Sequence, residues 1–105
     1  MDERLIGKWK QPETQTYPGL WFDFHADGTF TADYEPMAIK SGGTYETKEN
    51  GVIDVDQTSH TFGLVGKFLG LYEIDGSLLK LNLVSAEGHD RPANLTGAVL
   101  YERME

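Results

Sequence analysis

The chain has 105 residues and no cysteine, which fits one domain over residues 1–105 and excludes disulfides, thiolate metal sites and a cysteine nucleophile. Nine basic residues against 17 acidic ones give a formal net charge of −8, which argues against nucleic acid and anionic membranes as partners.

The N-terminus and the hydropathy of the chain limit its expected location. The first residues, MDER, do not form a basic leader followed by an apolar run. No apolar stretch approaches the ~20 residues of a membrane span. We therefore expect a soluble protein, cytoplasmic if this is the full chain and exported if a leader has been removed.

The first predicted elements are one helical turn and a strand. Asp2 can cap the turn, and Gly7 can end it with a positive φ. A strand over about residues 6–11 follows, and we expect the Trp9 ring to point from it into the interior.

Residues 20–34 predict a hairpin whose register follows from its side chains. A three-residue loop at 26–28, with Gly28 left-handed, separates an apolar face from a polar one, whereas a two-residue loop mixes them. Trp21 is the misfit and points outward. The predicted inward pairs are Phe24 with Phe30, Phe22 with Ala32 and Leu20 with Tyr34.

Two further hairpins follow the same logic. In residues 44–56 a loop at 49–51 places Tyr45, Thr47, Ile53 and Val55 on one face. In residues 71–83 Tyr72 and Ile74 alternate with polar residues, and a four-residue loop at 75–78 pairs Ile74 with Leu79.

The remaining segments complete an all-β pattern. Turn signals include Ser41-Gly42-Gly43, a less certain strand covers about residues 58–65, and the glycine-rich residues 63–70 suggest a bend, bulge or mobile strand. Residues 85–97 form the longest loop before a last strand at 98–104. Eight or nine short strands predict a single antiparallel up-and-down β-barrel, closed by pairing of the first strand with the last.

Several motifs resemble those of the lipocalins and of small bacterial lipocalin-like domains. They are Gly-x-Trp at Gly7 and Trp9, GLYEIDGSLLKL at 70–81, the dipeptide Arg91-Pro92, and YER at 101–103. The resemblance implies a barrel floor formed by Gly7, Trp9 and Arg103, with the arginine over the indole. The chain departs from the family because it is short, ends without a C-terminal helix, and has Leu95 where a phenylalanine is common.

The polar residues do not predict catalysis or a cofactor. His25, His60 and His89 lack metal-ligand spacing, and Asp54 and Asp56 face solvent in the predicted register. We therefore expect no metal, no cofactor and no enzymatic activity.

The interior of the barrel is the main candidate site. By resemblance it binds a small hydrophobic ligand, and the candidate lining residues are Phe22, Phe24, Tyr34, Tyr45 and Tyr72. The alternative is a filled barrel that serves as a structural or protein–protein interaction module, possibly a homodimer. Its face would include the outward Trp21, Leu69 and Leu71, unless these residues rest under the 85–97 loop.

Overall fold

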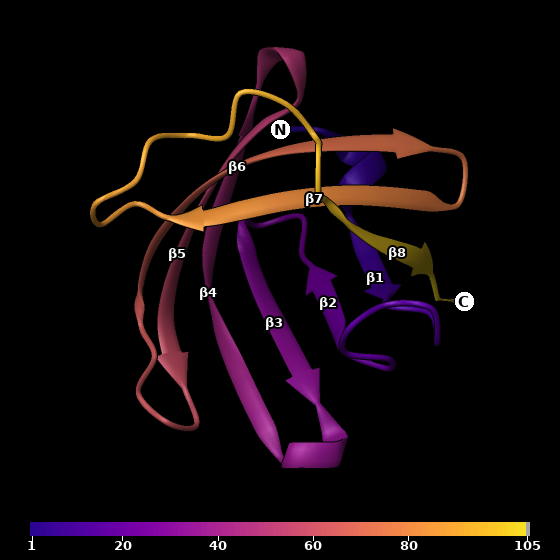
Figure 1. Ribbon diagram of the computed structural model, residues 1–105, viewed down its shortest axis with the longest axis vertical. Coiled ribbons are helices and arrows are strands. Elements are labelled where there is room, and N and C mark those ends of the chain that lie inside the picture. Colours follow the sequence, from indigo (N-terminus) through magenta and orange to yellow (C-terminus); the bar gives the residue numbers. More distant parts are fainter. Residues whose placement is uncertain (105) are drawn as a thin grey trace.

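Eight antiparallel strands follow one another along the chain and close into a barrel in the computed structural model, which describes residues 1–104 (Figure 1). The strands are β1 (Gly7–Lys10), β2 (Trp21–Phe24), β3 (Thr29–Tyr34), β4 (Ile39–Lys48), β5 (Val52–His60), β6 (Gly66–Asp75), β7 (Leu78–Ser85) and β8 (Val99–Arg103). Three short 3₁₀ turns accompany them: η1 (Glu3–Leu5), η2 (Glu35–Met37) and η3 (Glu49–Gly51).

Pairing of the first strand with the last closes the barrel. Trp9 lies opposite Arg103 and Lys10 opposite Glu102, and every other strand pairs with its neighbours in sequence. Closure leaves no long sheet edge exposed. The predicted all-β, up-and-down barrel is therefore confirmed, with eight strands.

The hairpin registers predicted from face separation are also confirmed. Phe24 lies opposite Phe30 and Phe22 opposite Ala32, around a three-residue loop in which Gly28 has φ 87°. Similarly, Tyr45 lies opposite Val55 and Thr47 opposite Ile53. Ile74 lies opposite Leu79, but the strands extend to Asp75 and Leu78, so two residues rather than four connect them.

Two predictions about strand boundaries are wrong. Ser41-Gly42-Gly43 is not a turn, because β4 runs through it; the chain reverses at η2 instead, with Ala38 left-handed at φ 51°. Residues 58–65 are not a separate strand. Residues 58–60 continue β5, and residues 61–65 form the loop to β6.

A β-bulge explains why the two glycines lie inside a strand. Gly43 lies opposite Gln57 and Gly42 opposite Ser59, so Thr58 is an extra residue in β5. A Cβ on Gly43 would overlap the carbonyl oxygen of Asp56, so this position excludes a side chain. The extra residue reverses the alternation of β5, and His60 comes to lie opposite Ser41 on the inner face.

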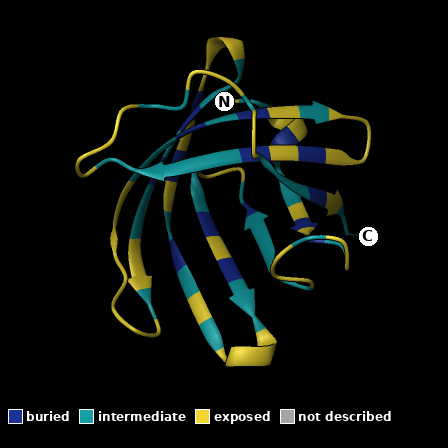
Figure 2. Ribbon diagram, viewed as in Figure 1, coloured by how far each residue is buried: buried dark blue, intermediate teal, exposed yellow. Residues whose placement is uncertain are grey.

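The core fills the half of the barrel next to the N-terminal turn (Figure 2). The largest fully buried side chains are Trp9, Phe24, Phe30, Leu5, Ile53 and Leu79. The indole Nε1 of Trp9 donates to the Leu5 carbonyl at 2.8 Å, so the turn is fixed to the ring that it covers. The Arg103 guanidinium lies 4.1 Å from the centre of the indole and donates to the carbonyls of Arg4 and Ile6.

Substituting Trp9 should destabilise the protein strongly. We expect Trp9→Ala to lower the free energy of unfolding by about 3–5 kcal/mol, because it leaves a large cavity beneath η1. Trp21→Ala is the matched control, since that ring is only half-buried on the outer surface, and it should cost less than about 1.5 kcal/mol. Urea unfolding measures both, and a Trp9→Ala loss below about 1 kcal/mol would contradict the assigned role.

Because of the bulge, we expect substitutions at the two adjacent glycines to lower stability by different amounts. Gly43→Ala should cost about 1–3 kcal/mol, because the new methyl group meets the backbone of β5. Gly42→Ala should cost less, since its Cβ would lie 3.0 Å from the Phe30 carbonyl oxygen and could be accommodated by a small shift. Equal losses in urea unfolding would show that the bulge does not require a glycine at position 43.

Candidate functional site

The two ends of the barrel differ in how they are closed (Figure 1). We call the end covered by η1 and η3 the closed end. The opposite end carries the segment 11–20, η2 and the 61–65 loop, and we call it the open end. The candidate site follows from what each end presents to solvent.

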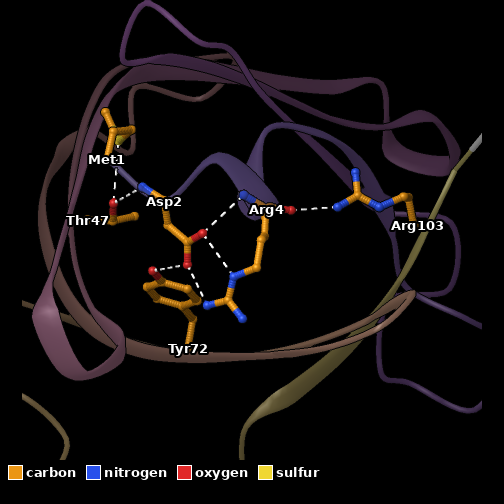
Figure 3. Close-up of polar contacts among 6 residues, drawn as sticks. All are labelled: Met1, Asp2, Arg4, Thr47, Tyr72 and Arg103. Carbon is orange, nitrogen blue, oxygen red and sulfur yellow. Dashed lines mark hydrogen bonds and ion pairs between the residues drawn. The ribbon is translucent and has the colours of Figure 1, made fainter.

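At the closed end, Asp2 joins the N-terminal segment to β4 and β6 (Figure 3). Its carboxylate accepts a hydrogen bond from the Tyr72 hydroxyl at 2.8 Å, and from Nε and Nη2 of Arg4 at 3.1 and 2.8 Å. Its backbone amide donates to Thr47 Oγ1 at 2.7 Å. These bonds hold η1 in place over the core.

The same contacts shift the acidities of both groups. Hydrogen bonds, first from Arg4 and then from Tyr72, lower the pKa of Asp2 to about 2. Burial, and then donation to Asp2, raises the pKa of Tyr72 to about 12. Asp2 is therefore charged and Tyr72 protonated at neutral pH, and the tyrosine hydroxyl is already engaged.

The closed end also has a broad surface depression of about 890 Å³ beside the N-terminus. Its walls include charged groups that are already paired: Asp2 with Arg4, and Lys48 with Asp54 at 2.8 Å. These pairs are satisfied within the protein, and the same walls carry the acidic residues Glu49 and Glu73, so the depression suits a hydrophobic ligand less well than its size suggests.

The open end contains a cavity of about 420 Å³ with mostly apolar walls, which we call the open-end cavity. Its apolar lining residues are Tyr17, Leu20, Phe22, Ala32, Tyr34, Met37, Ile39, Phe62 and Leu64. Phe22 separates the cavity from the core, because its ring stacks on Phe24 at 5.5 Å and meets Tyr101 edge-on at 5.6 Å. The interior is thus filled below Phe22 and hollow above it.

The rim of this cavity exposes large apolar side chains. Phe62 is 63% exposed and Leu64 64% exposed, and Met37 and Tyr17, which line the same cavity, are exposed as well. Exposed apolar groups gathered around one concave opening are typical of a binding surface.

The polar side chains in the cavity come from β4 and β5, with Asp33 of β3 also in its wall. Gln57 Nε2 donates to the Leu64 carbonyl at 2.6 Å, which holds the 61–65 loop near the opening. The backbone N–H of Phe62 donates to Nδ1 of His60 at 3.0 Å. Because an amide can only donate here, Nδ1 is the unprotonated nitrogen, and Nε2 carries the proton of the neutral ring.

The five predicted ligand residues do not share one location. Phe22 and Tyr34 line the open-end cavity. Phe24 and Tyr45 lie in the core, where the Tyr45 hydroxyl donates to the His25 carbonyl at 2.7 Å. Tyr72 lies at the closed end.

Sequence reasoning missed much of the cavity wall. Met37, Phe62 and Leu64 lie in turns and loops, where strand alternation gives no signal. Ser41 was missed because residues 41–43 were predicted as a turn, and His60 because the bulge that orients it has no sequence pattern of its own beyond a pair of glycines.

The other predicted polar residues are dispersed. His25 directly follows β2 near the closed end, His60 lies in the open-end cavity, and His89 lies in the β7–β8 loop. Within residues 1–104 no group of three or more histidine or acidic side chains is placed to hold a metal ion. Asp54 faces outward and pairs with Lys48 and Arg91, and both ion pairs lower its pKa.

The outward apolar residues have partners of their own. Arg91 donates to the carbonyls of Ile53 at 2.9 Å and Gly70 at 3.0 Å, which fastens the β7–β8 loop over β5 and β6. Leu95 of that loop and Leu71 line the same depression. The Lys8 ammonium lies 4.8 Å from the centre of the Trp21 ring.

Comparison with known proteins adds no assignment. A scan against protein-family models, a search of curated proteins and a search of solved structures each found no match to this chain. In the described residues, 1–104, no helix is both long enough and apolar enough to cross a membrane.

The Asp2 contacts predict a specific pH dependence. Because its folded pKa is about 2, below the ordinary value of 3.8, Asp2 contributes stability that is fully present above about pH 4 and is lost as the pH falls toward 2. The stability gap between the wild type and Asp2→Asn should therefore narrow over this range. Urea unfolding at several pH values measures the gap, and a constant gap would contradict the assignment.

Proposed function

We propose that this protein binds a small hydrophobic molecule in the open-end cavity and does not catalyse a reaction. The observation that carries the proposal is a concave space of about 420 Å³ with mostly apolar walls, enclosed by barrel strands and open to solvent. Ligand sites in proteins commonly have volumes of roughly 300–1,000 Å³ and walls of this composition.

The distribution of packing supports this role. The closed half contains the buried core, and the aromatic contacts of Phe22 form a firm base for the space above it. A cavity with a rigid base needs little rearrangement to accept a ligand, which reduces the entropic cost of binding.

The exposed rim supplies a driving force for binding. Phe62 and Leu64 leave more than half of their surface in water. Fully burying an apolar side chain of this size gains about 1.5–3 kcal/mol, and covering part of two gains a fraction of that for each. A hydrophobic ligand across the opening would gain this contribution.

The pair Ser41 and His60 in the cavity does not form a catalytic nucleophile and general base, which favours binding over catalysis. Ser41 lies opposite His60, as a catalytic serine and histidine would. A general base must present an unprotonated nitrogen to the hydroxyl. In His60 that nitrogen is Nδ1, which already accepts from the Phe62 amide.

The proposal also includes a finer assignment of the fold. We infer that the barrel is lipocalin-like, which agrees with the antiparallel order of its eight strands and with Arg103 lying over Trp9 beside Gly7. A Cβ on Gly7 would lie 2.8 Å from Arg103 Nη1, so a glycine there leaves room for the guanidinium. Dimerisation through the Trp21 face stays a prediction, and the Lys8 ammonium already occupies part of that surface.

The binding proposal can be tested with a neutral fluorescent probe, N-phenyl-1-naphthylamine. We expect saturable fluorescence enhancement with the wild type. Ala32→Phe should weaken binding roughly tenfold or more, because Ala32 lies in the cavity wall and the larger ring fills the space. Thr31→Phe is the matched control, because Thr31 is the exposed neighbour on the same strand.

Near-ultraviolet circular dichroism and urea unfolding show whether each variant is folded. Failure of the wild type to enhance the fluorescence of the probe, or an equal loss of affinity in both folded variants, would reject the open-end cavity as the binding site.

A further inference from the structure

The hydrogen-bonding role of His60 restricts what the open-end cavity can recognise. The Phe62 amide fixes Nδ1 as an acceptor, so Nε2–H is the donor of the neutral ring. No hydrogen bond to Nε2 is made by any group in residues 1–104, and His60 lines the cavity. The ring therefore has one donor free for a molecule that enters.

The fold brings this donor to the cavity by the bulge at Thr58. Without the extra residue, alternation from the inward Val55 and Gln57 would turn position 60 outward. The bulge in turn depends on the missing side chain at Gly43. His60 is thus positioned by a local backbone irregularity rather than by regular strand geometry.

The charge around the cavity disfavours an anionic ligand. No lysine or arginine within residues 1–104 lines it, and the acidic Asp33 lies beside its wall, although strand alternation directs this side chain to the outer face between the inward Ala32 and Tyr34. Lys40 lies opposite Asp33 in the β3–β4 pair, but it is exposed, forms no ion pair with Asp33 within the described chain, and does not line the cavity. The net charge of −8 acts in the same direction.

Resting on the proposed function, we propose that His60 is a specificity-determining residue that donates from Nε2 to the ligand. The ligand class is then uncharged hydrophobic molecules that carry a hydrogen-bond acceptor, such as a ketone or ester carbonyl. Apolar walls hold the hydrocarbon part, and the β4–β5 side of the cavity binds the acceptor.

A matched pair of ligands isolates this hydrogen bond. Propiophenone and propylbenzene differ only in a carbonyl in place of a methylene, and their affinities can be measured by displacement of N-phenyl-1-naphthylamine at pH 8. The preference of the wild type for the ketone should fall about three- to tenfold in His60→Phe, as expected for one lost hydrogen bond. Propylbenzene should bind both proteins similarly.

His89→Phe is the control, because His89 is an exposed histidine in the β7–β8 loop, and it should keep the wild-type preference. An anionic analogue, 3-phenylpropanoate, should bind more weakly than propiophenone. An unchanged ketone preference in His60→Phe, or tighter binding of the anion, would overturn the His60 assignment while leaving the cavity as a ligand site. If neither neutral ligand binds the wild type, the proposed function fails as well.

A measurement on the wild type keeps the test independent of any folding defect in the variant. Long-range ¹H–¹⁵N spectra of the imidazole rings report which nitrogen of His60 is protonated. We expect the Nε2–H form, with a shift of its resonances when propiophenone is added. A proton on Nδ1 in the neutral ring would overturn the inference.

Discussion

The barrel depends on the short contact between its first and last strands. Within residues 1–104 the β1–β8 pair is short: Trp9 lies opposite Arg103 and Lys10 opposite Glu102, and the Met104 amide donates to the Lys8 carbonyl at 2.9 Å, so few backbone hydrogen bonds hold this seam. Side chains reinforce it: Arg103 lies over the Trp9 ring and donates to the carbonyls of Arg4 and Ile6. One guanidinium therefore joins β8, β1 and the N-terminal turn, and satisfies carbonyls that the turn leaves without partners.

This seam explains why the two ends of the barrel differ. The turn η1 can cover the core only because the indole below it bonds the Leu5 carbonyl and Asp2 anchors its start to Thr47 and Tyr72. At the other end, the segment 11–20, η2 and the 61–65 loop surround an apolar opening. The contacts of Asp2 and Arg103 and the apolar opening thus lie at opposite ends of the barrel.

The sequence left open whether the barrel interior is filled by side chains or hollow, and the structure shows one half of each kind. Four aromatic rings, from Phe22, Phe24, Phe30 and Tyr101, pack in contact with one another across the middle. Below them the interior is solid, which stabilises a domain of only 105 residues. Above them the strands diverge into loops, and hydrophobic side chains remain in solvent, as a binding role would require.

The sequence by itself determined the fold class, the hairpin registers and the core residues that lie on strands, because strand alternation separates apolar from polar faces. Leu5 of the N-terminal turn is also in the core and was not predicted, since it lies outside any strand. Gly7, Trp9 and Arg103 were indicated by the resemblance of motifs at the two ends of the chain to those of a known family. Only the tertiary structure decided which inward residues pack and which line a cavity, because that depends on distance along the barrel axis. Phe22 and Phe24 are both inward-facing aromatic residues of one strand, yet Phe24 lies in the core and Phe22 in the cavity wall. The inward position of His60 needed the structure for a similar reason, since one extra residue at Thr58 reverses the alternation on which the sequence argument relies.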